Sequence, residues 1–299
     1  AILRDQAIVL SGEKSIGTDM PTEANTTWCI PYQPGLGSAV LESKPDVLVG
    51  DGFFQWSAVC IWHRFRHGIP FVCCYERWSH TERNAQWYRR AYRSMAFRYT
   101  DAISCNGSLS RNYVLSLGFP KENITIGHMA ADTAALSDKA RCVPEVEIAR
   151  LRSQWLGCLG SNENSLNNLS RGVGTVFLYV GRLILIKGLK ELLNGFAKFC
   201  DNELKGTNRV TTALVIIGTG PEEEGLRRQV EELKIDSVYF QGYVDYDNLA
   251  PYYAAADAFI IPTLEDNWSL VVPEAMACGL PILCSKYNGC WPELVQEGR

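Results

Sequence analysis

Short apolar runs alternate with longer segments of helical periodicity along most of this chain. The alternation is most regular in the second half, where the predicted strands are 175–180, 212–217, 237–241, 258–261 and 281–284. The helices predicted between them are 188–200, 221–234, 247–256 and a segment around 274–278. Such alternation is typical of βαβ units, whose parallel strands form a doubly wound sheet. The chain is therefore expected to be an α/β protein.

The first half shows the same pattern less clearly. Its predicted strands are 7–10, 47–49, 71–74, 102–104 and 124–126, and its predicted helices are 54–67, 84–99 and 109–117. Beyond residue 130 the pattern weakens, apart from a helix predicted at 144–156 and a polar loop or linker at 157–174. A chain of 299 residues is long enough for two domains. We expect Rossmann-like domains at 1–135 and 173–299, with a linker or helical connection at 136–172.

Charge and hydropathy exclude several classes of protein. The formal net charge is −4, so the chain as a whole does not resemble a nucleic-acid-binding protein. No apolar run is long enough to span a bilayer. The nearest candidate, 57–74, is interrupted by four polar or basic residues: His63, Arg64, Arg66 and His67.

The cysteines indicate a reducing compartment. The 11 cysteines have neither disulfide nor zinc-site spacing, which favours reduced thiols in a cytoplasmic protein. The chain starts at Ala1 without a charged and apolar leader, so a signal peptide is expected to be absent or removed.

An acidic loop follows the predicted strand 258–261. It carries Asp266 and Glu274, separated by seven residues, and ends in a helix bounded by Gly279 and Pro281. A loop at the carboxyl end of a parallel strand, leading into a helix N-terminus, is where open α/β sheets bind phosphorylated ligands. Two carboxylates at such a loop suit a ligand with an anionic part and several hydroxyls. A nucleotide sugar is such a ligand.

Two cations follow the predicted strand 175–180. Gly181 allows a tight exit from the strand, and Arg182 and Lys187 come next. An arginine fork and a lysine point charge together match a diphosphate. The competing interpretation is a pair of solvated surface cations.

Glycines mark the ends of two further strands. Gly218 and Gly220 follow 212–217, where glycine lets backbone approach a ligand. Tyr243 and Val244 follow the glycine after 237–241, where backbone can bond the edge of a base. Either segment could be an ordinary turn. The segment with Gly218 and Gly220 is not a dinucleotide fingerprint, because no third glycine follows at the right offset.

Taken in this order, the four segments resemble the nucleotide-sugar half of glycosyltransferase family 4, the retaining GT-B enzymes. The resemblance is strong over 170–299 and weaker over 40–135. It implies a GT-B fold with two Rossmann-like domains facing across a cleft. The N-terminal domain would be on the acceptor side and the C-terminal domain would bind the nucleotide sugar. Compared with the family, parts of both termini are expected to be missing.

The resemblance also implies roles for residues. Glu274 would hold the ribose, Asp266 would lie near the donor sugar, and Arg182 and Lys187 would clamp the diphosphate. The intervening loop would face phosphate and sugar with Asn267, Trp268, Ser269, Leu270 and Val271. Many family members have glutamate at the first acidic position and glycine where Ser269 stands, so the reading of the sugar hydroxyls is left open.

Acceptor-side candidates come from the first half of the chain. Glu76, Arg77 and His80 follow the predicted strand 71–74, and Asp51 follows 47–49. Ordinary cap and turn residues are the competing interpretation for both groups. Between residues 77 and 98 there are six arginines and one acid, interleaved with aromatics. This segment is either a solvated helix with a packed aromatic face or a contact with a membrane or lipid-linked acceptor.

The expected function is transfer of a sugar from a nucleoside diphosphate sugar to an acceptor hydroxyl, with retained configuration. The acceptor would be a carbohydrate, a lipid-linked molecule or another hydroxyl compound. The nucleotide sugar is a co-substrate, and no cofactor is expected. No Asp-x-Asp pair is interpreted as the mark of a metal-held diphosphate, so no metal is expected either. The protein would be cytoplasmic, or peripheral at a membrane.

Two alternatives remain open. The chain could be a catalytically silent nucleotide-sugar-binding protein, which would bind donor without turnover. It could also be a GT-B phosphorylase or a sugar-nucleotide epimerase. A nicotinamide dehydrogenase is disfavoured because the dinucleotide fingerprint is missing.

Overall fold

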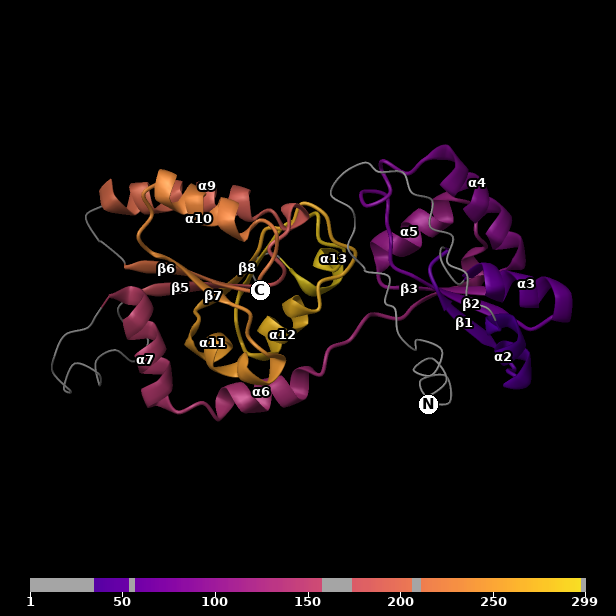
Figure 1. Cartoon of the computed structure of the whole chain (residues 1–299), viewed down its shortest axis with the longest axis horizontal. Helices are drawn as coiled ribbons and strands as arrows, with labels where there is room; N and C mark the ends of the chain where they lie inside the picture. Colours follow the sequence, from indigo (N-terminus) through magenta and orange to yellow (C-terminus); the bar gives the residue numbers. More distant parts are fainter. Residues whose placement is uncertain (1–34, 54–56, 158–173, 206–210, 297–299) are drawn as a thin grey trace. The chain divides into compact units, whose positions relative to one another are not determined.

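The computed structural model describes residues 35–53, 57–157, 174–205 and 211–296 (Figure 1). The chain divides into two compact units. The first contains the described residues up to Tyr75 together with 85–104 and 119–125. The second contains 76–84, 105–118 and the described residues from Ile126 onward. The domain boundaries at 135 and 173 stay predictions.

One sheet is formed by the strands of the first half of the chain. Its order is β1 (Leu48–Asp51), β2 (Phe71–Tyr75), β3 (Ala102–Cys105) and β4 (Ile124–Ile126). β1 runs parallel to β2, with Leu48 opposite Phe71. These strands confirm four of the five predicted in the first half. The fifth, 7–10, lies outside the described residues.

Helices of the first half are close to their predicted positions. α3 (Ser57–His67), α4 (Trp87–Ala96) with the 3-10 turn η1 (Phe97–Tyr99), and α5 (Ser108–Ser116) match the three predictions within a few residues. Helix α2 (Leu36–Glu42) and the 3-10 turn η2 (Lys121–Asn123) were not predicted.

The second unit contains a five-stranded parallel sheet. Its order is β7 (Val238–Gly242), β6 (Thr212–Ile217), β5 (Thr175–Val180), β8 (Ala258–Ile261) and β9 (Ile282–Cys284). From β5 the chain builds outward through β6 and β7, and then returns to add β8 and β9 on the other side. Strand order therefore reverses between β5 and β8. In open α/β sheets the carboxyl ends of the strands at such a switch point form the ligand-binding crevice.

Helices cover both faces of this sheet. α9 (Leu189–Lys205) and α10 (Glu223–Glu232) lie on one face, and α6, α7, α11 and α12 lie on the other (Figure 1). The bounds of these four are Thr133–Arg141, Glu145–Leu156, Ala250–Ala255 and Val271–Ala277. The 3-10 turns η3 (Leu185–Lys187) and η4 (Tyr246–Asn248) follow β5 and β7, and α13 (Trp291–Leu294) ends the described elements. The unit is doubly wound, as predicted.

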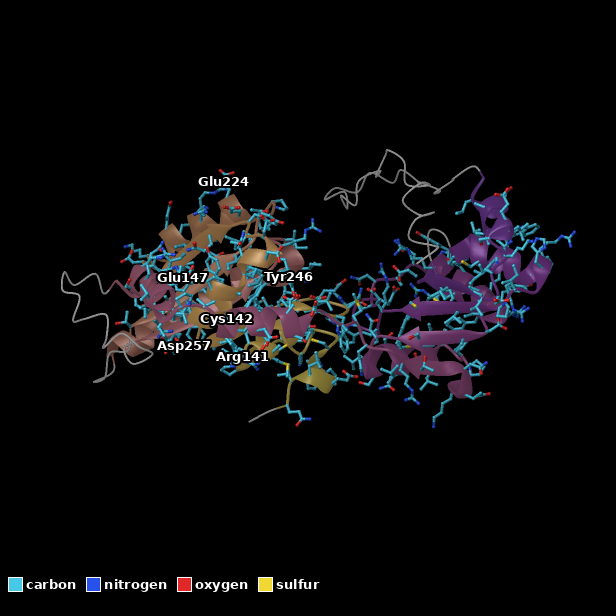
Figure 2. The ribbon with its side chains drawn as sticks, turned by 90° about the horizontal axis from the view of Figure 1, so that it is seen from below. Arg141, Cys142, Glu147, Glu224, Tyr246 and Asp257 are labelled. Atoms are coloured by element: carbon cyan, nitrogen blue, oxygen red, sulfur yellow. The ribbon has the colours of Figure 1, made fainter. Side chains whose placement is uncertain are left out.

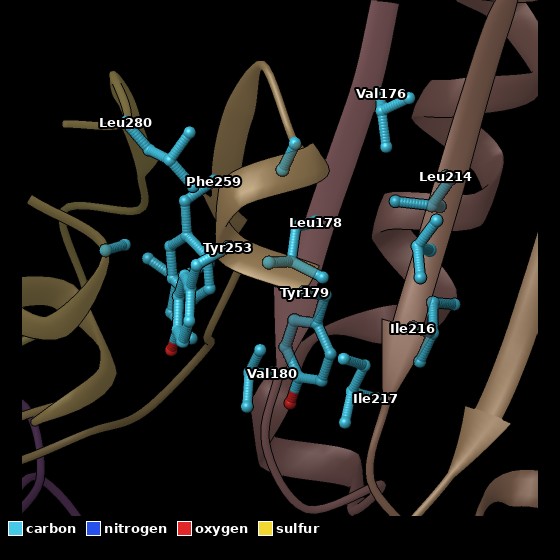
Figure 3. Packing of buried hydrophobic residues seen from close by; sticks show 14 of the residues in the cluster. Val176, Leu178, Tyr179, Val180, Leu214, Ile216, Ile217, Tyr253, Phe259 and Leu280 are labelled. Atoms are coloured by element: carbon cyan, nitrogen blue, oxygen red, sulfur yellow. The ribbon is translucent and has the colours of Figure 1, made fainter. Parts of the chain in front are cut away.

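The core of the second unit lies between its sheet and helices. β6 is buried along its whole length, and the rings of Tyr253 and Phe259 pack together beside Leu178 (Figure 3). Leu136 of α6 and Trp155 of α7 are each 1% exposed and belong to the same core. Helices within the predicted connection 136–172 are thus an integral part of this unit. The predicted loop 157–174 lies almost entirely outside the described residues.

Candidate functional site

The loops that leave β5 and β8 are fastened to each other at the switch point. The carbonyl of Ile186 accepts hydrogen bonds from the Leu264 amide (2.8 Å), the Thr263 hydroxyl (3.0 Å) and the Glu265 amide (3.2 Å). Thr263 is completely buried. These bonds hold the start of the acidic loop against the turn that carries Lys187.

Glycines pack the β6 loop against the β5 loop. A Cβ placed on Gly218 would lie 1.9 Å from the Gly181 carbonyl oxygen, and one on Gly220 would lie 2.3 Å from the Leu183 oxygen. The Gly181 and Gly218 amides donate to Ile217 and Gly242 within the sheet ends. Close packing between the loops therefore requires glycine at 218 and 220, and the predicted approach of this backbone to a ligand stays a prediction.

Lys187 and Asp266 form an ion pair across the switch point. Lys187 Nζ lies 2.5 Å from Asp266 Oδ2, and their side chains are 20% and 12% exposed. The Ser269 hydroxyl donates to the same Oδ2 at 2.5 Å, and the Trp268 amide donates to Oδ1 at 3.2 Å. Two residues assigned to donor binding from different sequence segments thus lie in direct contact.

Arg182 occupies the same loop as Lys187 and is exposed. Its carbonyl accepts a hydrogen bond from the buried Tyr179 hydroxyl at 3.0 Å, which fixes the backbone of the loop. Burial, with a smaller contribution from the Asp266 charge, raises the pKa of Tyr179, so this hydroxyl stays protonated. Among the described residues, no carboxylate lies within ion-pair distance of the Arg182 guanidinium. Its charge is available to an anionic ligand.

Glu274 lies in the first turn of α12 and is only 7% exposed. The Tyr253 hydroxyl, from α11, donates to its Oε2 at 3.2 Å. Burial raises the pKa of Glu274, and the bond from Tyr253 partly opposes this. In the described part of the chain, no hydrogen bond or ion pair joins Glu274 to Arg182, Lys187 or Asp266. The Glu274 carboxylate is therefore a separate polar group from the Lys187–Asp266 pair. The Glu274 amide donates to the Leu270 carbonyl, which joins Glu274 to the end of the acidic loop.

The loop after β7 carries two of the predicted donor-binding residues, one exposed and one packed against the core. Tyr243 is 71% exposed, while Val244 packs against the core. Tyr246, labelled in Figure 2, was not singled out from the sequence. Its hydroxyl donates to the Asp132 carbonyl at 3.3 Å, and burial and the nearby Glu274 carboxylate raise the pKa of Tyr246.

The middle of the acidic loop is largely buried. Trp268 is 6% exposed, its Nε1 donates to the Met129 carbonyl at 3.2 Å, and its ring stacks on His128 at 5.1 Å. Leu270 and Val271 pack against the core, and Asn267 Oδ1 is buried without a hydrogen-bond partner among the described residues. Trp268 therefore anchors this loop, and its predicted ligand contact would come from backbone.

Segment 76–84 packs on the acidic loop within the second unit. His80 Nε2 lies 2.9 Å from the Leu264 carbonyl oxygen, and its ring stacks on Tyr287 at 4.6 Å. Trp78 Nε1 donates to the Asp266 carbonyl at 3.0 Å. His80, one of the acceptor-side candidates, is thus in direct contact with the acidic loop.

The other acceptor-side candidates are placed differently. Arg77 pairs with the buried Glu82 at 3.3 Å, next to the half-buried Glu76. Asp51 is exposed at the end of β1 and belongs to the first unit. The structure brings neither Asp51 nor Arg77 into a contact that assigns them an acceptor role.

One cavity of about 440 Å³ lies away from these loops, between α6, α7, α11 and α12. Its lining includes Tyr253 and Cys278 but none of Arg182, Lys187, Asp266 or Glu274. We place the candidate site at the strand ends because the Lys187–Asp266 ion pair lies there.

The described residues include no group of three or more histidines, cysteines or acids placed to hold a metal ion. The chain does contain one Asp-x-Asp triplet, Asp245–Asp247, which the sequence interpretation did not use. Its Asp247 pairs with Lys139 at 2.6 Å. None of the helices in the described ranges has the length and apolar character needed to cross a bilayer.

Two family models match the chain. The model described as "Glycosyltransferase Family 4" matches residues 10–135, and the model described as "Glycosyl transferases group 1" matches residues 162–299. Together they account for most of the chain.

Curated relatives are glycosyltransferases by name. D-inositol 3-phosphate glycosyltransferase of Acidothermus cellulolyticus is 32% identical over 161 residues, which is 51% of this chain and 34% of that protein. N-acetyl-alpha-D-glucosaminyl L-malate synthase of Bacillus anthracis is 29% identical over 124 residues, 41% of this chain and 30% of that protein. The chain thus spans about a third of the length of these relatives.

Solved structures share the fold. The Anabaena protein HepE in complex with UDP has a TM-score of 0.67 at 20% identity, covering 88% of this chain and 66% of that chain. Sucrose-phosphate synthase from Thermosynechococcus elongatus has a TM-score of 0.61 at 19% identity, covering 85% of this chain and 59% of that chain. The two sheets have this fold, the first half of the chain matches the family 4 model and the second half matches the group 1 model, so the chain belongs to glycosyltransferase family 4, whose fold is GT-B.

Proposed function

We propose that this protein binds a nucleoside diphosphate sugar at the carboxyl ends of β5 and β8 and transfers the sugar to an acceptor hydroxyl with retained configuration. The observation that carries the proposal is the Lys187–Asp266 pair at the switch point, on whose β5 loop Arg182 is exposed and has no ion pair with any described carboxylate. An exposed arginine and a half-buried lysine on one loop provide both a donor fork and a point charge for a diphosphate.

Glu274 supplies the second half of the donor site. A buried carboxylate accepts hydrogen bonds strongly when its other partners are few, and a ribose presents two hydroxyls as donors. The Tyr253 hydroxyl leaves the second oxygen, Oε1, available for such a bond. Gly181, Gly218 and Gly220 shape the loops, and the backbone of 267–271 lines the sugar side.

A UDP-sugar is the first donor to test. The solved structures with this fold include HepE in complex with UDP-glucose and an Escherichia coli protein bound with UDP-2-fluoro glucose. These ligands are bound to those two proteins, and the shared fold supports using UDP-sugars as probes for this chain.

The transfer step would be driven by electrostatics. The bond between the anomeric carbon and the diphosphate oxygen breaks with its electron pair moving to the diphosphate. The acceptor oxygen bonds to the same face of that carbon, and its proton passes to the departing diphosphate. Arg182 and Lys187 stabilise the negative charge that develops, and losing one such contact costs about 2–4 kcal/mol of barrier. We propose that these two cations serve without a metal ion.

His80 is the acceptor-side residue that we favour, because its Nε2 lies 2.9 Å from the Leu264 carbonyl oxygen of the acidic loop. We also propose that the acceptor is a carbohydrate, a lipid-linked molecule or another hydroxyl compound. Contact of the arginine-rich segment 77–98 with a lipid surface is part of the same proposal. The nine described cysteines are all free, which supports a reducing, cytoplasmic setting.

The test compares Arg182→Ala and Glu274→Ala with wild type for binding and turnover of UDP-glucose. The matched control is Arg228→Ala, which removes an exposed arginine from α10. We expect both site variants to lose affinity at least tenfold and the control to behave as wild type. Undiminished binding in both variants would remove the donor-site assignment. Binding without turnover would favour a silent nucleotide-sugar-binding protein, and activity with inorganic phosphate would favour a phosphorylase.

A further inference from the structure

Three donors converge on the carboxylate of Asp266. Lys187 Nζ and the Ser269 hydroxyl share Oδ2, each at 2.5 Å, and the Trp268 amide binds Oδ1 at 3.2 Å. Ser269 is 5% exposed, so its hydroxyl has little access to water. The hydroxyl and the ammonium therefore compete for, and jointly fix, one carboxylate oxygen.

These contacts fix the position of the Lys187 ammonium. A lysine side chain has a flexible four-carbon stem, and ordering it at the moment of binding costs entropy. Asp266 holds the ammonium in place before a ligand arrives, and Ser269 holds Asp266. Ser269 thus acts on the cation through the carboxylate, without needing to touch a ligand.

We propose that Ser269 is a positioning residue for the diphosphate of the donor. By donating to Asp266 Oδ2, it orients the carboxylate that holds Lys187, and so sets the position of the charge that meets the diphosphate. This inference rests on the proposed function and names a determinant of affinity within that same site.

The pair Asp266 and Ser269 is also coupled sterically. A glutamate at position 266 would carry its carboxylate one methylene further, into the space that the Ser269 hydroxymethyl occupies 2.5 Å from Oδ2. Replacing serine by glycine would open that space. Asp266→Glu should therefore be tolerated only together with Ser269→Gly.

The competing explanation is purely structural, because Ser269 lies just before α12 and its carbonyl accepts the Val272 amide. Loss of a structural bond would weaken all ligands of the site alike. Loss of a positioning bond would weaken only ligands with a diphosphate. Comparing UDP with uridine separates the two.

The experiment measures binding of UDP and of uridine to wild type, Ser269→Ala and the control Ser153→Ala. Ser153 is a buried serine of α7 whose hydroxyl bonds the Arg150 carbonyl, remote from the loop in sequence and on another element. We expect Ser269→Ala to weaken UDP about fivefold, as for one lost hydrogen bond, with uridine unchanged and the control as wild type.

A second arm uses the coupled pair. Asp266→Glu should weaken UDP at least as much as Ser269→Ala, and Asp266→Glu with Ser269→Gly should recover to within about twofold of wild type. Equal losses for UDP and uridine, or an unchanged affinity for UDP in Ser269→Ala, would overturn the positioning role. Failure of wild type to bind any nucleotide sugar would instead overturn the proposed function.

Discussion

The acids of the candidate site differ in whether a cation offsets the cost of burying their charge. Lys187 and Asp266 form an ion pair across the switch point, whereas the side-chain contact of the buried Glu274 carboxylate within the described residues is the Tyr253 hydroxyl. Desolvation disfavours the charged form of an acid, which is why the pKa of Glu274 is raised above its ordinary value of 4.5. Because the pKa of Glu274 differs between the folded and unfolded states, the free energy of unfolding should depend on pH.

Replacing Glu274 by glutamine should make this visible. Because the pKa is raised in the folded state, the folded wild type gains stability from this group at low pH and loses it as pH rises through the raised value. Glutamine does not titrate, so Glu274→Gln should gain stability relative to wild type between pH 4 and pH 7. Urea denaturation at several pH values measures the difference. A difference that shrinks as pH rises would contradict the assignment.

Elements of the second unit depend on close contact between loops at the strand ends. Gly218 combines a φ of 132° with a Cβ position only 1.9 Å from the Gly181 oxygen. Gly218→Ala should therefore destabilise the protein by about 1–3 kcal/mol or more, and should also weaken UDP binding by displacing the β5 loop.

Gly195 provides the matched control for that substitution. It is an exposed position within α9, with no atom within 4 Å of its added Cβ. Gly195→Ala should stabilise the protein by about 0.5–1 kcal/mol. Thermal denaturation of both variants measures the contrast, and equal effects would show that loop packing does not explain Gly218.

Helix α7 is tied to the sheet by one arginine. Arg152 is 2% exposed and donates to the Ala255 carbonyl (2.9 Å), the Gly174 carbonyl (2.9 Å) and Asp257 (2.8 Å). Arg152→Met should cost about 3 kcal/mol, the low end for a broken buried pair, because the Asp257 side chain keeps 30% exposure. Arg150→Met, at an exposed position of the same helix, should change stability by less than about 0.5 kcal/mol. Chemical denaturation measures the free energy of unfolding of both variants, and equal losses for Arg152→Met and Arg150→Met would contradict this role of the buried arginine.

Prediction from sequence succeeded for elements with a strong local pattern. β5, β6 and β8 have the predicted bounds because their apolar runs are sharply delimited. Helix α6 was missed because its buried face is made by Leu136, Ser137 and Ala140, which leave little apolar periodicity. The predicted helix at 221 begins at Glu223 instead.

The candidate site was predictable only in part. The cations and acids could be placed at strand ends by sequence, since parallel strands bring their carboxyl ends to one edge. The contact of Tyr253 could not be predicted, because its bond to Glu274 depends on where the fold places α11 and α12, which both pack on α6. The role of the site glycines was also hidden, since backbone-to-backbone packing leaves no mark in the sequence beyond the glycine itself.

At the scale of the whole molecule, the two units should respond differently to a ligand. Arg182, Lys187, Asp266 and Glu274 all belong to the second unit. UDP at a hundred times its dissociation constant should stabilise that unit by about 2.7 kcal/mol. Differential scanning calorimetry should resolve two transitions, and UDP should raise only the one that Arg152→Met lowers. A shift of the other transition would place the ligand in the first unit.

The Lys187–Asp266 pair joins residues 79 positions apart in the chain. During translation the first partner leaves the ribosome well before the second is made. At synthesis rates of about 5–20 residues per second, the delay is roughly 4–16 s. Throughout that interval the Lys187 ammonium lacks the Asp266 carboxylate, so the ion pair at the switch point can form only after β8 and the loop that follows it have been added.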